Sequence, residues 1–254
     1  MTLSASTLTL LEKAASDNGF DVGLPRVGAW IVFASTQAPL KIWLTVADGG
    51  PPIASVSQLN VARALANYGT PSAEPLPSGA MAALTVADMP ALHRLLRRAF
   101  QLSRTLPDEL LHAFEKKVAT FPKTTEAERL VVQRVGQDIF RAGLIDYWEG
   151  RCAITGLAIP ELLRASHIKP WADCAADAER LDMFNGLLLA AHLDAAFDKG
   201  FITVADDGAV TFSPTLPAEA RVILGIDRPL RLSTLADGHR AYLPWHRQYV
   251  FRRA

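Results

Sequence analysis

The sequence contains little cysteine and no excess of charge of either sign. Cys152 and Cys174 are the only cysteines among 254 residues, so the chain offers no framework of paired disulfides. Lysine and arginine number 26, and aspartate and glutamate also number 26, so the formal net charge is zero. This balance neither indicates nor excludes a polyanionic partner, because acidic residues elsewhere can offset a local basic face.

Long hydrophobic runs and internal repeats are also missing. No apolar stretch is long enough to cross a bilayer, and the N-terminus lacks the basic and apolar segments of a secretory signal. We therefore expect a cytoplasmic protein with no membrane partner. Because 50% of the residues are hydrophobic, the chain has enough apolar material for one large core or two smaller ones.

Residues 1–120 are expected to form a domain of mixed α/β structure. Trp30–Ala34 and Lys41–Val46 are rich in β-branched and aromatic residues, which predicts two strands. Gly49–Pro52 should end the second strand. Two helices and a loop rich in Pro, Gly, Ser and Ala are predicted over residues 7–18, 57–66 and 69–80.

Further helices are predicted toward the middle of the chain, over 89–103 and 107–120, where Asp108 and Glu109 suit a helix start. Phe121–Thr125 interrupts the helical pattern and is the predicted domain boundary. Glu126–Trp148 has apolar residues at helical spacing, which predicts a helical connector at the start of a C-terminal domain, 121–254. The expected fold class is therefore α+β.

The residues that suggest chemistry lie in the C-terminal half. Hydrolysis of a phosphodiester needs an activated water and a divalent ion that absorbs charge. His167 follows an apolar run, and a histidine with a pKa near neutrality can activate water. Asp194 and Asp198 are four residues apart, so on a helix both carboxylates share a face and can bind one Mg²⁺. His192 would face elsewhere, and it can join them only if the helix begins near it.

Three short patterns occur in order within residues 151–201. They are Ser-His-Ile-Lys-Pro-Trp from Ser166, Asn-Gly-Leu-Leu-Leu from Asn185, and His-Leu-Asp with Phe-Asp from His192. Together they resemble the HNH, or ββα-metal, nuclease family, and the resemblance extends over about residues 126–254. It implies a hairpin that carries His167 as the general base and Asn185 as a tie within the hairpin loop. It also implies metal ligands at Asp194 and Asp198 on the helix that follows.

Two departures from the family pattern affect metal binding. The residue before the general base is often an Asp or His ligand, whereas Ser166 is a weak ligand, so waters and His192 are candidates to complete the shell. The Cys-x-x-Cys pairs that hold a structural zinc in many members are absent, and no structural zinc is expected. Cys152 is predicted to be a core residue, and no role is assigned to Cys174.

Each site residue also has a structural interpretation. His167 could be a hydrogen-bonded histidine without catalytic function, and His192 could be a helix-start residue or a group that orients the phosphate. Asp194 and Asp198 could form a solvated helix face, with Asp198 paired to Lys199.

Basic residues suggest where DNA could bind. Arg164 and Lys169 flank the predicted site and are candidates for phosphate contacts, although ordinary surface charge explains them equally well. The run from His93 to Arg104 has four arginines and no acidic residue. On a helix, Arg94, Arg97 and Arg98 lie near one side, which favours a DNA-binding face over a merely solvated one. The tail, with His246-Arg247 and Arg252-Arg253, is basic too.

The function of the N-terminal domain is less defined by its sequence. Trp30, Phe33, Trp43 and Tyr68 could stack on a base, but at least two of the four are expected in the core. The order of the two domains resembles that of bacterial restriction enzymes, some of which respond to modified DNA.

The sequence thus predicts a metal-dependent DNA endonuclease with a restriction or defence role, whose N-terminal domain selects the target. Mg²⁺ or Mn²⁺ is the expected cofactor, with zinc or nickel as substitutes in crystals, and double-stranded DNA is the expected partner. A homodimer is an open option. One alternative is an inactive HNH fold that binds DNA, which Ser166 favours because a serine stands where a metal ligand is often found. The other is an effector nuclease that is activated by a small molecule at the N-terminal domain.

Overall fold

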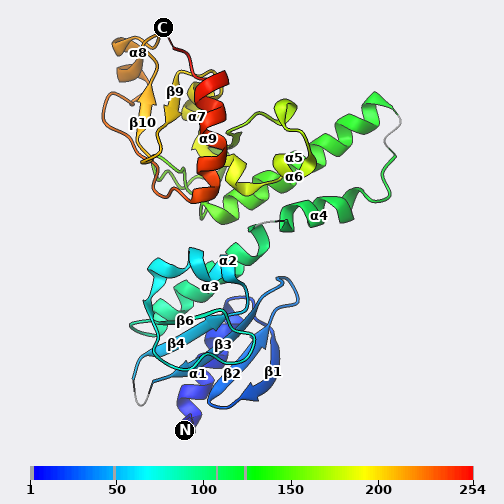
Figure 1. Cartoon of the computed structure of the whole chain (residues 1–254), viewed down its shortest axis with the longest axis vertical. Coiled ribbons are helices and arrows are strands. Elements are labelled where there is room, and N and C mark those ends of the chain that lie inside the picture. Colours follow the sequence, from blue (N-terminus) through cyan, green and yellow to red (C-terminus); the bar gives the residue numbers. More distant parts are fainter. Residues whose placement is uncertain (1–2, 48–49, 107, 123–124, 254) are drawn as a thin grey trace. The chain divides into compact units, whose positions relative to one another are not determined.

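The computed structural model describes residues 3–47, 50–106, 108–122 and 125–253. The chain divides into two compact units, Met1–Leu106 and Pro107–Ala254, and both combine helices with antiparallel strands (Figure 1). Throughout the described ranges, no helix combines the length and the apolar content needed to cross a bilayer.

The described strands of the first unit form one antiparallel sheet in the order β1-β2-β3-β4-β6-β5. Their bounds are Val22–Val27 (β1), Trp30–Ala34 (β2), Lys41–Val46 (β3), Pro52–Val56 (β4), Thr70–Pro71 (β5) and Ala82–Thr85 (β6). The strands β2 and β3 have the predicted bounds, whereas the sequence patterns did not indicate the other four, and β5 lies within the predicted loop.

Prolines explain why the sequence patterns did not indicate two of these strands. Pro25 lies in β1, which is tolerated because β1 is an edge strand of the sheet. Pro52 is the first residue of β4, where the missing N–H costs least. The break predicted at Gly49–Pro52 is only partly testable, because Gly49 lies outside the described residues.

Three helices accompany the sheet in the described part of this unit: Ala5–Asp17 (α1), Leu59–Ala64 (α2) and Met89–Thr105 (α3), with a 3₁₀ turn at Ala66–Tyr68 (η1). They confirm the three predicted here. The carboxylate of Asp88 accepts a hydrogen bond from the Ala91 N–H at 2.7 Å and caps α3. Because Leu92, Leu95 and Leu96 are buried, the opposite side of α3 leaves Arg94 and Arg97 exposed.

Two of the four aromatic residues considered for base stacking belong to the core instead. Trp30 and Trp43 are 8% and 4% exposed and pack with Val32, Ile53 and Ala83. Phe33 and Tyr68 are partly exposed. The expectation that at least two of the four aromatics are core residues is confirmed.

The second unit begins with two packed helices, Glu109–Val118 (α4) and Glu126–Tyr147 (α5). The Thr125 hydroxyl and the Glu128 carboxylate form a capping box that starts α5. A side chain at Gly143 on α5 would collide with Leu110 on α4, so the two helices approach closely. This contact explains why the compact units divide after Leu106, whereas the predicted boundary was Phe121–Thr125.

A hairpin and a helix follow in the order expected of a ββα module. Leu163–His167 (β7) pairs antiparallel with Gly186–Ala190 (β8), and Ala191–Asp198 (α7) continues directly from β8. His167 lies opposite Gly186 in the register. A Cβ at Gly186 would lie 2.5 Å from the Phe140 ring of α5, so the glycine allows α5 to reach the hairpin.

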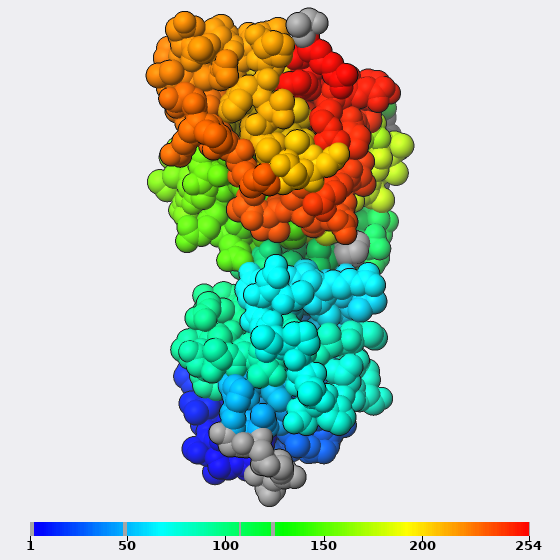
Figure 2. Space-filling view, turned by 60° about the vertical axis from the view of Figure 1, so that its left-hand side comes forward, coloured from blue at the N-terminus to red at the C-terminus, as the bar shows by residue number. Residues whose placement is uncertain are grey.

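The remaining described elements of this unit lie before the hairpin, within its connecting loop and after α7. They are Pro160–Leu162 (η2), Trp171–Asp173 (η3), Asp177–Arg180 (α6), Met183–Asn185 (η4), Ile202–Val204 (β9), Val210–Phe212 (β10), Ala218–Ile223 (α8) and Asp237–Tyr249 (α9). The strands β9 and β10 pair antiparallel. Space-filling atoms of the orange segment that includes α8 and of the red C-terminal helix α9 occupy one face of this unit (Figure 2).

Candidate active site

A pocket of about 310 Å³ opens beside the end of β7. Ser166 and His167 line it from the strand, Trp171 from the following turn, and Asp198 and Lys199 from the end of α7. The hairpin and the helix therefore bring the predicted base and one predicted metal ligand to the same cavity.

His167 is held by rings on two sides and by one backbone carbonyl. Its ring stacks on Phe140 with centroids 3.8 Å apart, and Trp171 meets it edge-on at 5.6 Å. Nε2 lies 2.9 Å from the carbonyl oxygen of Arg180. Because a carbonyl only accepts, Nε2 is the nitrogen that carries the proton, which leaves Nδ1 with a free lone pair.

The surroundings of His167 keep its ring neutral. Burial lowers the pKa of His167 to about 4, although the hydrogen bond to the Arg180 carbonyl acts in the opposite direction. At neutral pH the imidazole is therefore unprotonated at Nδ1 and able to accept a proton from water.

The two carboxylates of α7 meet at the Ser166 hydroxyl. Ser166 is 2% exposed, and its Oγ donates to Oδ1 of Asp198 at 3.2 Å. Burial and then the charge of Asp198 raise the pKa of Asp194, while the Ser166 hydroxyl lowers it. Burial also raises the pKa of Asp198. Two carboxylates that repel each other across a hydroxyl form an acidic oxygen-rich corner of the site.

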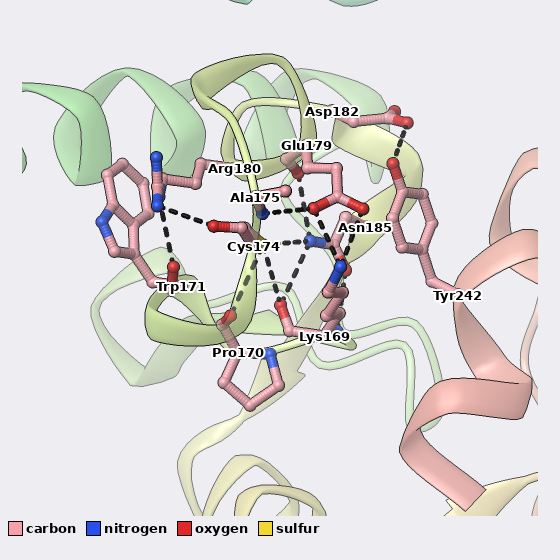
Figure 3. Close-up of polar contacts among 10 residues, drawn as sticks. All are labelled: Lys169, Pro170, Trp171, Cys174, Ala175, Glu179, Arg180, Asp182, Asn185 and Tyr242. Atoms are coloured by element: carbon pink, nitrogen blue, oxygen red, sulfur yellow. Dashed lines mark hydrogen bonds and ion pairs between the residues drawn. The ribbon is translucent and has the colours of Figure 1, made fainter. Parts of the chain in front are cut away.

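Asn185 ties together the long loop between β7 and β8, as the resemblance implied. The residue is fully buried, and its Oδ1 accepts from the Lys169 N–H at 2.8 Å. Its Nδ2 donates to the carbonyls of Lys169 and Glu179, each at 3.1 Å (Figure 3). Asn185 thereby fixes both ends of the loop that follows His167.

Lys169 has a different partner from the predicted phosphate. Its Nζ lies 2.8 Å from Oε1 of Glu179, and the Glu179 carboxylate also accepts from the Ala175 N–H at 2.7 Å. The Lys169 side chain is only 16% exposed. This ammonium group holds the loop, and the predicted phosphate contact of Lys169, which would compete with this ion pair, stays a prediction.

The other predicted site residues lie at varied distances from the pocket. Arg164 is exposed, donates to the Glu161 and Leu163 carbonyls, and lowers the pKa of Asp194 by its charge. It thus lies near the acidic corner, as a phosphate contact would require. His192 is exposed at the second position of α7 and is not part of the pocket lining. Because α7 begins at Ala191, the condition for His192 to join the site is met, and its role stays a prediction.

Three features of the site escaped sequence reasoning. Lys199 lines the pocket, and its charge lowers the pKa of Asp198. Cys174 is 3% exposed, and its thiol donates to the Pro170 carbonyl at 3.4 Å, which gives this cysteine a place in the loop (Figure 3). His246 also lines the pocket.

His246 corrects the interpretation of the C-terminal tail as simply basic. The residue is 1% exposed and stacks on Phe197 at 3.8 Å between ring centroids. Nδ1 lies 2.9 Å from the Thr203 hydroxyl and Nε2 lies 3.1 Å from the Phe197 carbonyl. Burial lowers the pKa of His246 to about 4, so the ring is neutral. Its position on α9, far along the chain from the motif, gave no signal in the sequence.

Cys152 is a core residue, as predicted, and it also accepts hydrogen bonds. It is 1% exposed, and its Sγ lies 3.4 Å from the Thr155 nitrogen and 3.3 Å from the Ala190 nitrogen. The thiol thus joins the turn after α5 to the start of α7.

A divalent metal fits the acidic corner only with oxygen ligands. Among the residues that the structure describes, no group of three His, Cys, Asp or Glu side chains could hold a metal ion by itself. Asp194, Asp198 and the Ser166 hydroxyl nevertheless provide hard oxygen atoms, and Mg²⁺ commonly keeps several waters. These residues suit a hydrated Mg²⁺ or Mn²⁺ and do not suit a structural zinc.

A hairpin that carries a ring-packed histidine, followed by a helix with two carboxylates, is the arrangement that the resemblance to ββα-metal nucleases implied. Residues 152–205 match the family model of HNH endonucleases. No curated protein sequence matches the chain. This match over residues 152–205 supports nuclease activity in general and points to DNA as the substrate.

Proposed function

We propose that this protein is a metal-dependent DNA endonuclease of the HNH type, in which His167 is the general base. The observation that carries the proposal is the shared pocket of His167 and Asp198, with the Nε2 proton of His167 turned to the Arg180 carbonyl. This arrangement leaves Nδ1 as the only ring nitrogen able to take a proton from an attacking water.

The side chains around the pocket have complementary roles. Asp194, Asp198 and Ser166 would hold a hydrated Mg²⁺ or Mn²⁺, which supplies charge stabilisation for a phosphate and its leaving oxygen. Phe140 and Trp171 restrict the His167 ring to one orientation. Lys199 and Arg164 are the cations best placed for phosphate contacts, because Lys169 already pairs with Glu179.

The first unit is proposed to select the target, and duplex DNA, modified or unmodified, is the proposed substrate. The exposed Arg94 and Arg97 on α3, with Arg98 beside them, support a phosphate-binding face in this unit. A role in restriction or defence fits a nuclease whose target is chosen outside its catalytic module, and a homodimer would suit cleavage of both strands.

The test is cleavage of plasmid and of modified and unmodified genomic DNA with Mg²⁺, Mn²⁺ or a chelator. We expect metal-dependent nicking or cutting, and we expect His167→Ala to reduce it about 10³-fold while DNA binding persists. The control is His112→Ala, because His112 is an exposed histidine on α4 in the same unit.

Other results would redirect the proposal. If the parent protein binds DNA but never cuts it with any divalent ion, the domain is an inactive HNH fold. If cutting requires a co-purified small molecule, the protein is a ligand-activated effector. If His167→Ala cuts as fast as the parent, His167 is not the base.

A further inference from the structure

The carbonyl that accepts the hydrogen bond from His167 Nε2 belongs to a very short helix. It is the carbonyl of Arg180, the last residue of α6, and the last carbonyls of a helix have no partner within it. A four-residue helix has almost no stability of its own. The position of this carbonyl therefore depends on contacts made outside α6.

The Arg180 side chain makes two hydrogen bonds outside α6 and one ion pair within it. Its Nη2 donates to the Cys174 carbonyl at 2.7 Å, and its Nε donates to the Trp171 carbonyl at 3.2 Å (Figure 3). Its Nη1 pairs with the Asp177 carboxylate at 2.9 Å. The guanidinium group also lies over the Trp171 ring, 5.9 Å from its centroid. One side chain thus connects both ends of the segment 171–180 and the residue that packs against His167.

The neighbouring carbonyl is fixed separately. Asn185 donates to the Glu179 carbonyl at 3.1 Å, so successive carbonyls at the end of α6 serve Asn185 and His167. Asn185 holds Glu179 to the hairpin, whereas the carbonyl oxygen of Arg180 is bonded to His167. The rigid fork of a guanidinium group suits a residue that must bind two carbonyls and a carboxylate at once.

We propose that Arg180 is a positioning residue for His167, because its guanidinium group fixes the carbonyl that keeps the proton on Nε2 and leaves Nδ1 free. Arg180 therefore acts on the reaction through the backbone and not by binding DNA. The catalytic consequence rests on the proposed function, whereas the effect on the histidine ring does not.

The experiment combines ¹⁵N NMR of the histidine rings at neutral pH with DNA cleavage kinetics. The His167 signals are assigned by their loss in His167→Gln. Arg180→Met removes the donors and keeps the length of the side chain, and Arg180→Lys keeps one charged donor group. Arg231→Met is the matched control, because it removes an exposed arginine that pairs with Asp207 in the same unit.

In the parent protein and in Arg231→Met we expect the Nε2-protonated pattern for His167. In Arg180→Met we expect a mixture of the two tautomers and a kcat about 10- to 100-fold lower at unchanged KM for DNA. Arg180→Lys should recover part of the Nε2-protonated pattern and part of the kcat. If Arg180→Met does not fold, the same two measurements are made on Arg180→Lys.

An unchanged tautomer pattern with unchanged kcat in Arg180→Met overturns the inference. A loss of kcat with the parental tautomer pattern also overturns it, because the side chain would then act by another route. If the parent protein does not cut DNA, the proposed function fails, and the ring signals alone still decide the role of Arg180.

Discussion

The basic side chains of the two units differ in their exposure and in their partners. On α3 of the first unit, Arg94 and Arg97 are exposed because the other side of the helix is buried against the sheet. In the loop of the second unit, Lys169 and Arg180 are bonded to Glu179 and Asp177 and to backbone carbonyls. Many backbone carbonyls of an irregular loop have no partner in a helix or sheet, so nearby basic side chains donate hydrogen bonds to them. A basic residue within an irregular loop is therefore a weaker indicator of DNA contact than one on the exposed side of a helix.

The largest effect is expected on the metal requirement of cleavage. It should change with a substitution at the proposed site of the second unit and not with one on the proposed DNA-binding face of the first. Asp198→Asn removes one charge from the acidic corner, so we expect the metal concentration for half-maximal cleavage to rise about 10- to 100-fold. Arg97→Met should leave this metal requirement unchanged. Metal titrations of plasmid cleavage measure both. An equal metal requirement in parent and Asp198→Asn would remove Asp198 from the ligand set.

The next prediction concerns the stability of the second unit at acidic pH. His239 and His246 in the second unit are buried, and burial lowers the pKa of each to about 4. An unfolded histidine takes up a proton below about pH 6.5, whereas these two do so only near pH 4. The stability that comes from keeping these two histidines neutral is fully present above pH 6.5. As the pH falls toward 4, the free energy of unfolding decreases by up to about 3 kcal/mol for each histidine.

Denaturant unfolding at pH 7, 6, 5 and 4 tests this sign. Burial raises the pKa of Asp182, Asp194 and Asp198, so proton uptake by these carboxylates favours the native state as the pH falls and opposes the effect of the histidines. We expect the second unit to lose stability between pH 6.5 and 4. A stability that stays constant over this range would contradict the burial of neutral histidines.

A smaller effect is expected at Lys169. Lys169→Met breaks the ion pair with Glu179, so we expect a lower melting temperature of the second unit and slower cleavage. The salt dependence of DNA binding should not change, because the ammonium group is directed into the loop. Fluorescence anisotropy with labelled duplex DNA at several salt concentrations measures this. A shallower salt dependence would show that Lys169 contacts phosphate after all.

The smallest effect is expected on α3. Arg97→Met should weaken DNA binding without changing stability, and it should reduce the slope of log Kd against log salt concentration by about one. Lys13→Met, on α1 of the same unit, is the control, because Lys13 pairs with Asp17. If both variants bind DNA equally well, the arginine face of α3 is only a solvated surface.

The sequence was most informative where chemistry and periodicity were local. The strands at Trp30 and Lys41 and the helices α3 and α5 follow the predicted patterns closely. The motif around His167 and Asn185 also predicted the hairpin and the loop tie. Each of these features depends on residues close together in the chain.

Contacts between distant residues could not be predicted in the same way. The side chain of His246 reaches the pocket only because α9 packs against β9 and α7. The pairing of Lys169 with Glu179 depends on the path of an irregular loop. Likewise, α4 joins the second unit because Gly143 admits Leu110, which no periodicity in α4 reveals.

Gly186 illustrates how chemistry can depend on a residue that has no functional group. It lies opposite His167 in the hairpin, and the space that it leaves is filled by Phe140, whose ring stacks on the imidazole. Any larger residue at 186 would push that ring away and admit solvent beside the histidine. A substitution at position 186 is therefore expected to disturb the histidine from the opposite strand, and mutational scans that look only for reactive side chains would overlook this position.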